Sequence, residues 1–349
     1  MATKINIRSP FYYKLSDGNL ASADLTISIG TGVVGSVVER YNLTKTEAGT
    51  NNYVVFEISE LVRDYIATEF SGSYNNEPVW VKLDYVIKNA AGGQVTNGSD
   101  TYLAFYGYAE YEGGIQNNSV STNQGSRNKL FSNNKIFIPD NETLVVPVFS
   151  EDVADVTFQG DTTTVVTTTS TTDTDSKIAY ASVNLASVGN VTNVLIETIT
   201  GDINVPVEVI DCSKYDPLKV TFYNKSGALQ DLFFFAKNIE AVSRTAEKYK
   251  SSVYNAGTNS YSINQHQYAN LSVTGKESIT LNTGYVSQDY NEPIKELMMS
   301  EKVWLTKDSV VYPINVTSSS VQFKNRLNDS LVAYTIEAEY AFDTVQNVR

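Results

Sequence analysis

The stretch that decides the fold is residues 276–349, KESITLNTGYVSQDYNEPIKELMMSEKVWLTKDSVVYPINVTSSSVQFKNRLNDSLVAYTIEAEYAFDTVQNVR. It starts with a strand-like alternation, passes through a helical pattern and returns after Ser300 to a period of two residues. Its strand runs are residues 277–282, then 302–306 paired with 310–316 across 307–308, then 320–326 paired with 331–342 across 327–329. The stretch predicts one helix packed on a four- or five-stranded antiparallel sheet.

The helix lies between the first two strands of this stretch. Asp289 or Asn291 is expected to cap it, and Pro293 lies in its first turn, where the missing N–H removes no hydrogen bond. The apolar stripe, at i, i+3 and i+4, consists of Ile294, Leu297 and Met298. One side of this helix should therefore face the sheet.

The closing strand has one apolar and one polar face. The apolar face consists of Tyr334, Ile336, Ala338 and Tyr340. Glu337 and Glu339 lie on the other face, together with Thr335 and Ala341. Two acids two residues apart on a strand suggest a catalytic pair, but strand alternation alone produces the same pattern. We interpret this pair as solvated.

Both ends of the chain resemble a group of structural proteins from tailed bacteriophages. The resemblance rests on LNTGYVSQDYNEPIKELMMSEKVWL, the hairpin after it, YTIEAEYAFDTVQN, and the N-terminal runs KINIRSPFYYK and FEISELVRDYI. It implies a virion component of the tail or baseplate, and it brings no catalytic residues. The middle of the chain is outside the resemblance.

Composition predicts a mainly β protein. Among 349 residues, 23 are Tyr and 14 are Phe, whereas Met contributes three and His one, and Thr and Asn are frequent. Such a composition suits strands and polar loops better than helices. The expected fold class is several antiparallel β-sandwich or sheet domains with a few short helices.

Charge and cysteine content bound the function. The formal net charge is −13 and basic residues are not clustered, which argues against nucleic acid as a partner. The single cysteine, Cys212, cannot form a disulfide within the chain and is interpreted as a small core residue. No run approaches the ~20 apolar residues of a membrane span, and no signal peptide is evident, so we expect synthesis in a host cytoplasm and no membrane insertion.

The chain divides into four parts. These are an N-terminal β domain with one helix (1–112), a polar linker or arm (113–134), a small β-sandwich with a Thr-rich loop (135–211) and a C-terminal antiparallel β domain with one helix (212–349). The linker is long and nearly free of apolar residues, and such loops are usually functional or ordered by a neighbour. We interpret it as an arm that reaches an adjacent subunit.

Two patterns in the N-terminal domain need interpretation. Gly30, Gly32 and Gly35 match a dinucleotide-binding fingerprint, but a β-rich run follows instead of a helix, so we interpret them as hairpin or bulge residues. Ser59 is expected to cap a helix that continues to about Phe70. Aromatic residues near residues 102–111 could bind sugar or a partner subunit, and a two-sided core with a subunit interface is the preferred interpretation.

The middle domain contains a Thr-rich segment in which nine of residues 161–175 are Thr. It is either a solvent-facing hairpin or a flexible loop tip. Carboxylates near it could bind calcium, namely Asp152, Asp155, Asp173 and Asp175. They lack EF-hand spacing, so no metal or cofactor site is predicted.

The C-terminal domain contains an irregular polar region. Residues 240–250 are interpreted as a long strand leaving the sheet, and residues 255–268 as a polar, Tyr-bearing loop. The only histidine, His266, lies in that loop without a nucleophile elbow or an oxyanion loop nearby. We therefore predict no catalytic residues and no enzyme.

Two classes of function remain. The first is a structural virion subunit, either at the tail tip or baseplate within a ring or as a head-decorating or neck protein. Its partners would be other virion proteins and copies of itself, and its location the virion. The second is a receptor- or glycan-binding module that contacts the host surface through aromatic loops. Trp80 and Trp304 both lie inside strand patterns, which favours core positions over a binding pocket.

Overall fold

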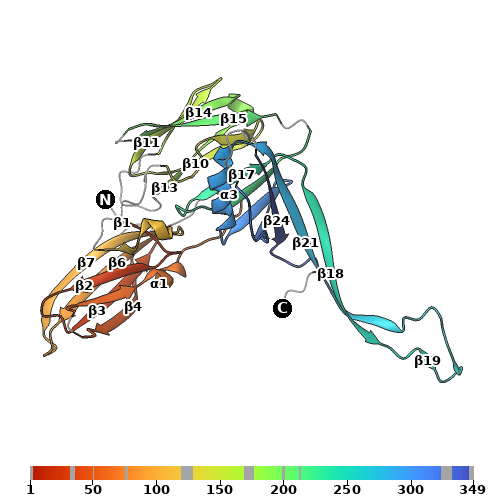
Figure 1. Ribbon diagram of the computed structural model, residues 1–349, viewed down its shortest axis with the longest axis horizontal. Helices are drawn as coiled ribbons and strands as arrows, with labels where there is room; N and C mark the ends of the chain where they lie inside the picture. The colour runs from red at the N-terminus through yellow and green to blue at the C-terminus, as the bar shows by residue number, and fades with distance from the viewer. Residues whose placement is uncertain are drawn as a thin grey trace.

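The computed structural model describes residues 3–31, 36–49, 51–74, 78–118, 129–168, 177–198, 201–211, 214–323 and 332–345. It confirms the predicted fold class, since strands make up 56% of the structure and helices 8%. The strands form three lobes along the chain, which we name the N-terminal lobe (3–118), the middle lobe (129–211) and the C-terminal lobe (214–345) (Figure 1). Whether their limits are those of independently folding domains stays a prediction.

The N-terminal lobe is built from two sheets. One has the order β1-β7-β6-β3-β4 and the other β5-β2-β8. Their strands are β1 (Thr3–Asn6), β2 (Phe11–Ser16), β3 (Ser22–Gly30), β4 (Val38–Thr46), β5 (Tyr53–Glu57), β6 (Val79–Lys88), β7 (Gln94–Phe105) and β8 (Gln116–Asn117). Alternating apolar side chains, such as Val79, Val81 and Leu83 on β6, point into the core between them. The β3–β4 pairing agrees with the hairpin interpretation of the glycine pattern, although residues 32–35 lie outside the described part.

The predicted helix from residue 59 to about 70 is wrong in its length and cap. Helix α1 covers only Ser59–Arg63, and its N-cap is Ile58. The Ser59 hydroxyl bonds to Glu57, and the Tyr65 and Ile66 amides donate to the carbonyls three residues earlier, which tightens and ends the helix. Beyond this turn the chain leaves to pack Phe70 against Trp304 of the C-terminal lobe.

The middle lobe contains two facing sheets, β10-β13 and β12-β11-β14-β15-β9. Its strands are β9 (Ile136–Pro139), β10 (Thr143–Phe149), β11 (Val153–Gly160), β12 (Thr164–Thr167), β13 (Ile178–Asn184), β14 (Val191–Thr198) and β15 (Ile203–Ile210). A four-residue helix, α2 (Leu185–Val188), is capped by the Asn184 side chain. The described half of the Thr-rich segment forms the hairpin strand β12, and residues 169–176 lie outside the described part.

The C-terminal lobe is a seven-stranded antiparallel sheet, not the predicted four- or five-stranded one. Its order is β17-β16-β22-β23-β24-β21-β18. The strands are β16 (Leu218–Tyr223), β17 (Leu229–Phe234), β18 (Ile239–Lys250), β21 (Tyr268–Val286), β22 (Val303–Lys307), β23 (Val310–Val316) and β24 (Val332–Tyr340). The sheet is larger because strands from residues 218–250, remote in sequence, join the terminal stretch on both sides.

Helix α3 (Asn291–Met298) covers this sheet as predicted, but its start differs. Asn291 is its first residue, and Ser287 instead caps the preceding 3₁₀ turn, η3 (Gln288–Tyr290), by accepting from the Asp289 amide. Ile294 and Leu297 are buried against the sheet, which confirms the apolar stripe.

Part of the terminal pairing was predicted wrongly. The β22–β23 hairpin forms, but its turn lies at Asp308 and Ser309, one residue later than the predicted 307–308, because Lys307 still pairs with Val310; both turn residues have positive φ. Residues 317–323 form no strand, and β24 pairs with β23 and β21 instead. The predicted turn at 327–329 lies outside the described residues. The alternating faces of β24 are confirmed, because its even-numbered residues 332–340 are buried.

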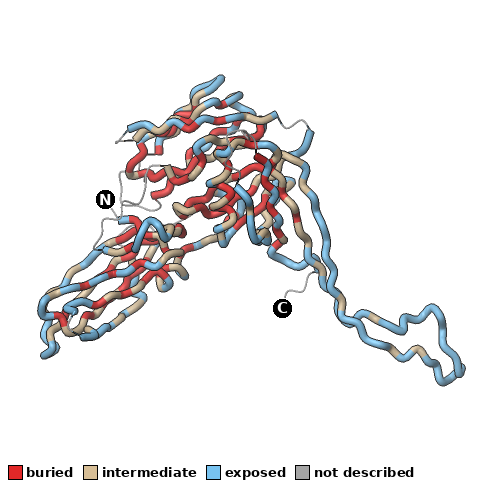
Figure 2. The backbone as a smooth tube through the Cα atoms, in the orientation of Figure 1, coloured by how far each residue is buried: buried red, intermediate tan, exposed pale blue. Residues whose placement is uncertain are grey.

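The three lobes share hydrophobic clusters. One combines Trp80, Leu103 and Phe105 of the N-terminal lobe with Leu130, Phe149 and Ile178 of the middle lobe and Ala228 of the C-terminal lobe. The buried parts of the chain accordingly meet at the centre of the molecule, whereas a two-stranded ribbon at the far end contains no buried residue (Figure 2).

Candidate functional site: a projecting arm

The feature that stands apart from the body is a hairpin formed by β18 and β21. Their pairing runs from Ile239–Thr280 in the sheet out to Lys250–Tyr268. The part beyond the sheet, residues 241–276, we name the arm; Figure 1 shows it extending away from all three lobes. At ~3.3 Å per residue, its paired section is about 30 Å long. The predicted strand leaving the sheet at residues 240–250 is therefore confirmed.

The arm exposes apolar side chains without burying any residue. Eight of the 22 exposed large hydrophobic residues in the described part of the chain belong to it: Val242, Tyr249, Tyr254, Tyr261, Ile263, Tyr268, Leu271 and Val273. Ile263 is 90% exposed and Leu271 71%. A concentration of exposed apolar surface on a projecting element is typical of an interaction site.

The two faces of the arm differ in chemistry. Residues that lie directly opposite across the hairpin share a face, and the pairs include Val242–Glu277, Arg244–Gly275 and Ala246–Val273. Lys248 and Lys250 continue this face by alternation. We name it the cationic face: Val242, Arg244, Lys248, Lys250, Tyr268 and Val273. The opposite face, which we name the hydroxyl face, carries the hydroxyls of Ser243, Thr245, Ser272 and Thr274 together with Glu247, Tyr249 and Lys276.

The base of the arm is anchored to the sheet. Lys276 forms an ion pair with Glu339 of β24 at 3.5 Å, and Lys307 pairs with Glu240. The Thr344 amide donates to the Gly275 carbonyl at 2.9 Å. Farther along β21, Ile279 and Leu281 are buried in the core of the C-terminal lobe. The arm is thus a continuation of a packed strand.

The tip of the arm holds the polar, Tyr-bearing loop predicted from sequence. A short ladder of β19 (Tyr254–Asn255) and β20 (Ser260–Tyr261) places Tyr254 opposite Tyr261. The Tyr254 hydroxyl donates to Asn259 Oδ1 at 2.5 Å. His266, the single histidine, is exposed in this tip.

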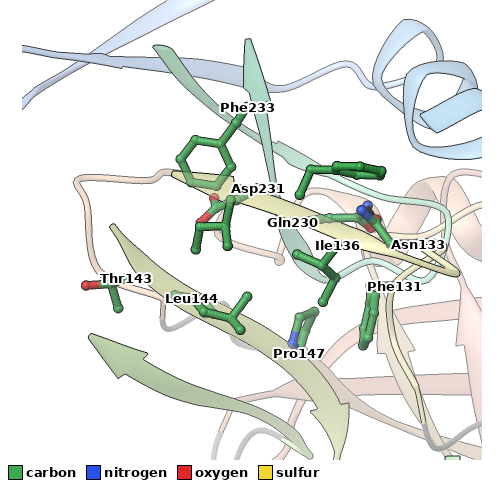
Figure 3. A pocket seen from close by; sticks show the side chains of 12 residues that line it. Phe131, Asn133, Ile136, Thr143, Leu144, Pro147, Gln230, Asp231 and Phe233 are labelled. Carbon is green, nitrogen blue, oxygen red and sulfur yellow. Dashed lines mark hydrogen bonds between the residues drawn. The ribbon is translucent and has the colours of Figure 1, made fainter. Parts of the chain in front are cut away.

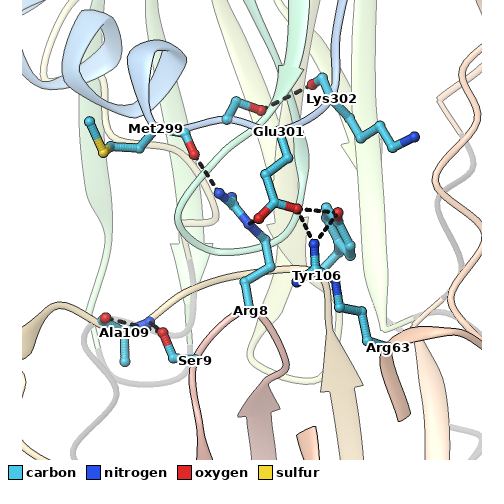
Figure 4. A network of polar contacts seen from close by, with 9 residues as sticks. Arg8, Ser9, Arg63, Tyr106, Ala109, Met299, Glu301 and Lys302 are labelled. Carbon is cyan, nitrogen blue, oxygen red and sulfur yellow. Dashed lines mark hydrogen bonds and ion pairs between the residues drawn. The ribbon is translucent and has the colours of Figure 1, made fainter. Parts of the chain in front are cut away.

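The body behind the arm is held together by charged contacts between lobes. Glu301, just after α3, pairs with Arg63 and lies 3.5 Å from Nε of the almost fully buried Arg8. The Tyr106 hydroxyl donates to the same carboxylate at 2.7 Å, and Arg8 also donates to the Met299 carbonyl (Figure 4). No sequence pattern indicates this network, because its members come from distant segments.

A second charged contact joins the same two lobes. Glu110 accepts from Lys225 at 2.7 Å and from Lys295 at 2.9 Å. These two ammonium groups hold the pKa of Glu110 at about 2. Both networks connect the N-terminal lobe to the segment around α3, which fixes the sheet from which the arm projects.

A buried carboxyl lies where the chain returns from the linker. Glu296 on α3 is 4% exposed, and burial raises its pKa to about 7. Its Oε2 is 3.5 Å from the Lys225 amide, and Ser132 and Lys129 lie close to it. Burial also lowers the pKa of Lys129 to about 8. Sequence analysis missed Glu296, whose neighbours on the helix gave only an apolar stripe.

A small cavity lies between the middle and C-terminal lobes. It is about 20 Å³, room for roughly one water molecule, and is lined mostly by apolar side chains of β9, β10 and β17 (Figure 3). The half-buried Asp231 carboxylate at its edge accepts from Thr221 at 2.6 Å and Tyr74 at 2.5 Å. These partners satisfy the carboxylate, so we interpret the cavity as part of the packed seam between lobes.

The other residues singled out from the sequence are considered by their positions in the fold. Trp80 and Trp304 are 1% and 7% exposed, which confirms their core positions. Glu337 is exposed, and Glu339 pairs with Lys276. Asp155 lies on the middle lobe, whereas Cys212, Asp173 and Asp175 lie outside the described residues. Within the described ranges, no group of three or more His, Cys, Asp or Glu side chains could hold a metal ion.

The predicted linker is described at its two ends. Gln116 in β8 is buried and pairs the chain with β2, and Leu130 and Phe131 are buried on the return side. Residues 119–128 lie outside the described part, so contact with an adjacent subunit stays a prediction.

Comparison with models of protein families gave no match, and comparison with curated proteins gave no similar sequence. Among the helices of the described residues, none has the length and apolar character needed to cross a bilayer.

Proposed function

We propose that this chain is a non-enzymatic structural subunit of a tailed-phage virion, at the tail tip or baseplate, that assembles with copies of itself and with other virion proteins. The observation that carries the proposal is the arm, which projects from a braced sheet and exposes apolar side chains. Projecting hairpins of this kind can extend into a neighbour and form contacts that the isolated chain lacks. The resemblance of both chain ends to tailed-phage structural proteins supplies the virion context.

The mechanism is geometric. The charged contacts at Glu301 and Glu110 and the shared hydrophobic clusters fix the lobes, so the arm has a defined direction relative to the body. A fixed direction repeats the same angle between successive subunits, which is the requirement for a closed ring. Covering the apolar side chains of the arm supplies the driving force for association.

The location can be tested on particles. Gradient-purified phage particles should contain the chain at a constant copy number by mass spectrometry, and immunogold labelling should place it at the distal end of the tail. Labelling at the head or neck would replace the tail-tip position by the head-decorating or neck alternative. Detection only in the soluble fraction of infected cells would contradict a virion role.

Contact with the host surface is a second candidate, favoured by the tyrosines at the tip. Tyr254 and Tyr261 lie opposite each other and are 58% and 69% exposed. Aromatic faces that are half exposed can stack on sugar rings. Screening the chain and a Tyr254→Ser/Tyr261→Ser variant against host-surface glycans tests this function; binding that the variant loses would support it, and no binding would leave the assembly role alone.

A further inference from the structure

The charges of this chain are segregated between two distant parts. The arm has four basic residues, Arg244, Lys248, Lys250 and Lys276, and one acidic residue, Glu247. Its formal charge is therefore +3, although the whole chain carries −13, and the expectation from the sequence that basic residues are not clustered is wrong for this segment. Within the described residues, no carboxylate forms an ion pair with Arg244, Lys248 or Lys250.

The middle lobe has the opposite charge. Residues 129–211, the middle lobe, contain 12 of the 39 acidic residues of the chain and only three of the 26 basic ones, Lys129, Lys135 and Lys177. Lys135 and Lys177 already form ion pairs, with Glu208 and Glu151. The unbalanced negative charge of the lobe is thus available to an external cation.

Several of these acids lie on the outer face of the sheet β12-β11-β14-β15-β9. Val156 and Ile196 point into the core, so Asp155 and Glu197, which lie directly opposite each other on β11 and β14, point outward. Asp202 is exposed just before β15. We name Asp155, Glu197 and Asp202 the acidic sheet face. Like charges directly opposite on neighbouring strands repel each other, and the buried Asp155 Oδ1 has no hydrogen-bond partner among the residues that the structure describes.

The acidic sheet face also has apolar surface to match the arm. Val165 on β12 is 58% exposed, and Leu195 on β14 is half-buried. Both lie opposite Thr157 of β11, on its two sides, and so share its face of the sheet. On the arm, Val242 and Val273 lie among the cations. The cationic residues 244–250 span about 20 Å, close to the ~19 Å width of five strands, so the arm can cross the sheet.

Resting on the proposed function, we infer that the cationic face of the arm docks across the acidic sheet face of the middle lobe of a second copy of this chain. Figure 1 shows the arm pointing away from β11 and β14 of its own chain, so the complementary surfaces meet only between copies. The contact joins two different surfaces and is therefore head to tail, which generates a ring or an open filament according to the angle between copies.

Charge reversal on full-length chains tests this contact. The arm variant is Arg244→Glu/Lys248→Glu/Lys250→Glu, and the sheet variant is Glu197→Lys/Asp202→Lys. Each variant alone places like charges at the contact, and we expect each to sediment as a monomer at a concentration where the wild type is oligomeric. Mixed in equal amounts, the two variants have complementary surfaces again, and the mixture should recover the oligomer.

A matched control changes the opposite face of the arm. Thr245→Glu/Ser272→Glu/Thr274→Glu adds negative charge to the hydroxyl face and should leave at least half of the wild-type association. The wild-type oligomer should also weaken at least tenfold between 0.05 and 0.5 M salt, because ions screen the contact. Circular dichroism checks that each variant is folded. If the sheet variant unfolds, Glu197→Gln/Asp202→Asn replaces it, and this neutral variant should associate more weakly with the wild-type arm.

The outcomes separate this contact from the virion role. A wild type that stays monomeric at all salt concentrations, variants that still associate, or a mixture that stays monomeric would each overturn the docking of arm on sheet. Capture of the arm by a different protein of the particle, with no self-association, would overturn it as well. None of these results removes the chain from purified particles, whereas absence from particles would overturn the proposed function and leave the contact intact.

Discussion

At the scale of single residues, the carboxyl group of Glu296 is an ionisable group in a buried environment that disfavours its charged form. A buried carboxylate loses its hydration, and here an amide of Lys225 and the hydroxyl of Ser132 replace only part of it. Asn224, Gln230 and Asn133 continue a buried polar network close by, linked by bonds of 2.9 and 2.5 Å. The interface between linker and helix is therefore polar and sensitive to protonation.

This burial predicts a pH-dependent stability. The pKa of Glu296 rises from 4.5 to about 7 on folding, so the folded state binds a proton more tightly than the unfolded state. Its contribution to stability is present below pH 4.5 and is lost as the pH rises towards 7. Glu296→Gln keeps the size and an acceptor without the charge, and should raise the free energy of unfolding at pH 7.5 by up to about 3 kcal/mol.

Urea unfolding at pH 5 and pH 7.5 measures this effect. The stabilisation by Glu296→Gln should be small at pH 5 and larger at pH 7.5. The difference between variant and wild type cancels the titration of the other carboxyls. An equal difference at both pH values would show that Glu296 is not protonated in the folded chain.

The Glu301 carboxylate predicts a second residue-scale effect. It is the partner of two arginines and a tyrosine from the N-terminal lobe, and the Arg8 side chain is only 7% exposed. Glu301→Gln leaves a largely buried guanidinium without its counter-ion and should lower the free energy of unfolding by about 1–3 kcal/mol, since Glu301 itself is 41% exposed. Glu292→Gln, which removes the exposed pair with Lys295 within α3, should cost less than about 0.5 kcal/mol. Equal shifts in the two denaturation midpoints would contradict a structural role for this network.

At the scale of elements, the arm is separable from the core. No residue of 241–276 belongs to a hydrophobic cluster of the described chain. The strand pattern is interrupted by one bulge, between Glu247 and Lys248, which leaves Leu271 unpaired and 71% exposed. The arm therefore contributes little to folding, and its regular strand pairing serves another purpose.

Replacing the arm by a short turn tests this separation. Thr245 and Thr274 lie opposite each other, so an Asn-Gly turn between them closes a two-residue hairpin in place of residues 246–273. The melting temperature by circular dichroism should stay within about 3 °C of the wild type, because a loss of less than 1 kcal/mol produces a small shift. Sedimentation should show a monomer. A truncated chain that aggregates or melts far lower would show that the arm supports the sheet.

At the scale of the whole molecule, the lobes should unfold together. Trp80 lies in the cluster that combines residues of all three lobes. Trp304 lies among Phe70 and Tyr223, with ring centroids 5.6 and 5.9 Å away, in the core shared by the N-terminal and C-terminal lobes. Opening any one lobe exposes apolar surface of another, which couples their stabilities.

Fluorescence of single-tryptophan chains measures this coupling. Trp80→Phe reports through Trp304, and Trp304→Phe reports through Trp80. For each variant, the unfolding curve measured by fluorescence is compared with the unfolding curve of the same variant measured by circular dichroism. The two curves should have the same midpoint. Two separate transitions would show that the lobes are independent domains connected by weak interfaces.

Local pattern was sufficient for the strands. Alternation of apolar residues predicted the buried face of β24 and the stripe on α3, because burial of one face requires a fixed period. The same logic failed for the helix from residue 59, because the hydrogen bond of Ser59 to Glu57 and the short turn at residues 65–66 end that helix early. It also failed for the strand at residues 320–326, since alternation does not identify the partner of a strand.

The sequence by itself determined the β class, the strand periods, the polar loop at the arm tip and the opposite charges of the arm and the middle lobe. Each depends on residues close together in the chain. Only the tertiary structure decided the seven-stranded order, the contacts of Arg8 and Glu110 between lobes, the burial of Glu296 and the projection of the arm from the body. These depend on which distant segments meet, and a linear pattern of side chains fixes faces but not partners.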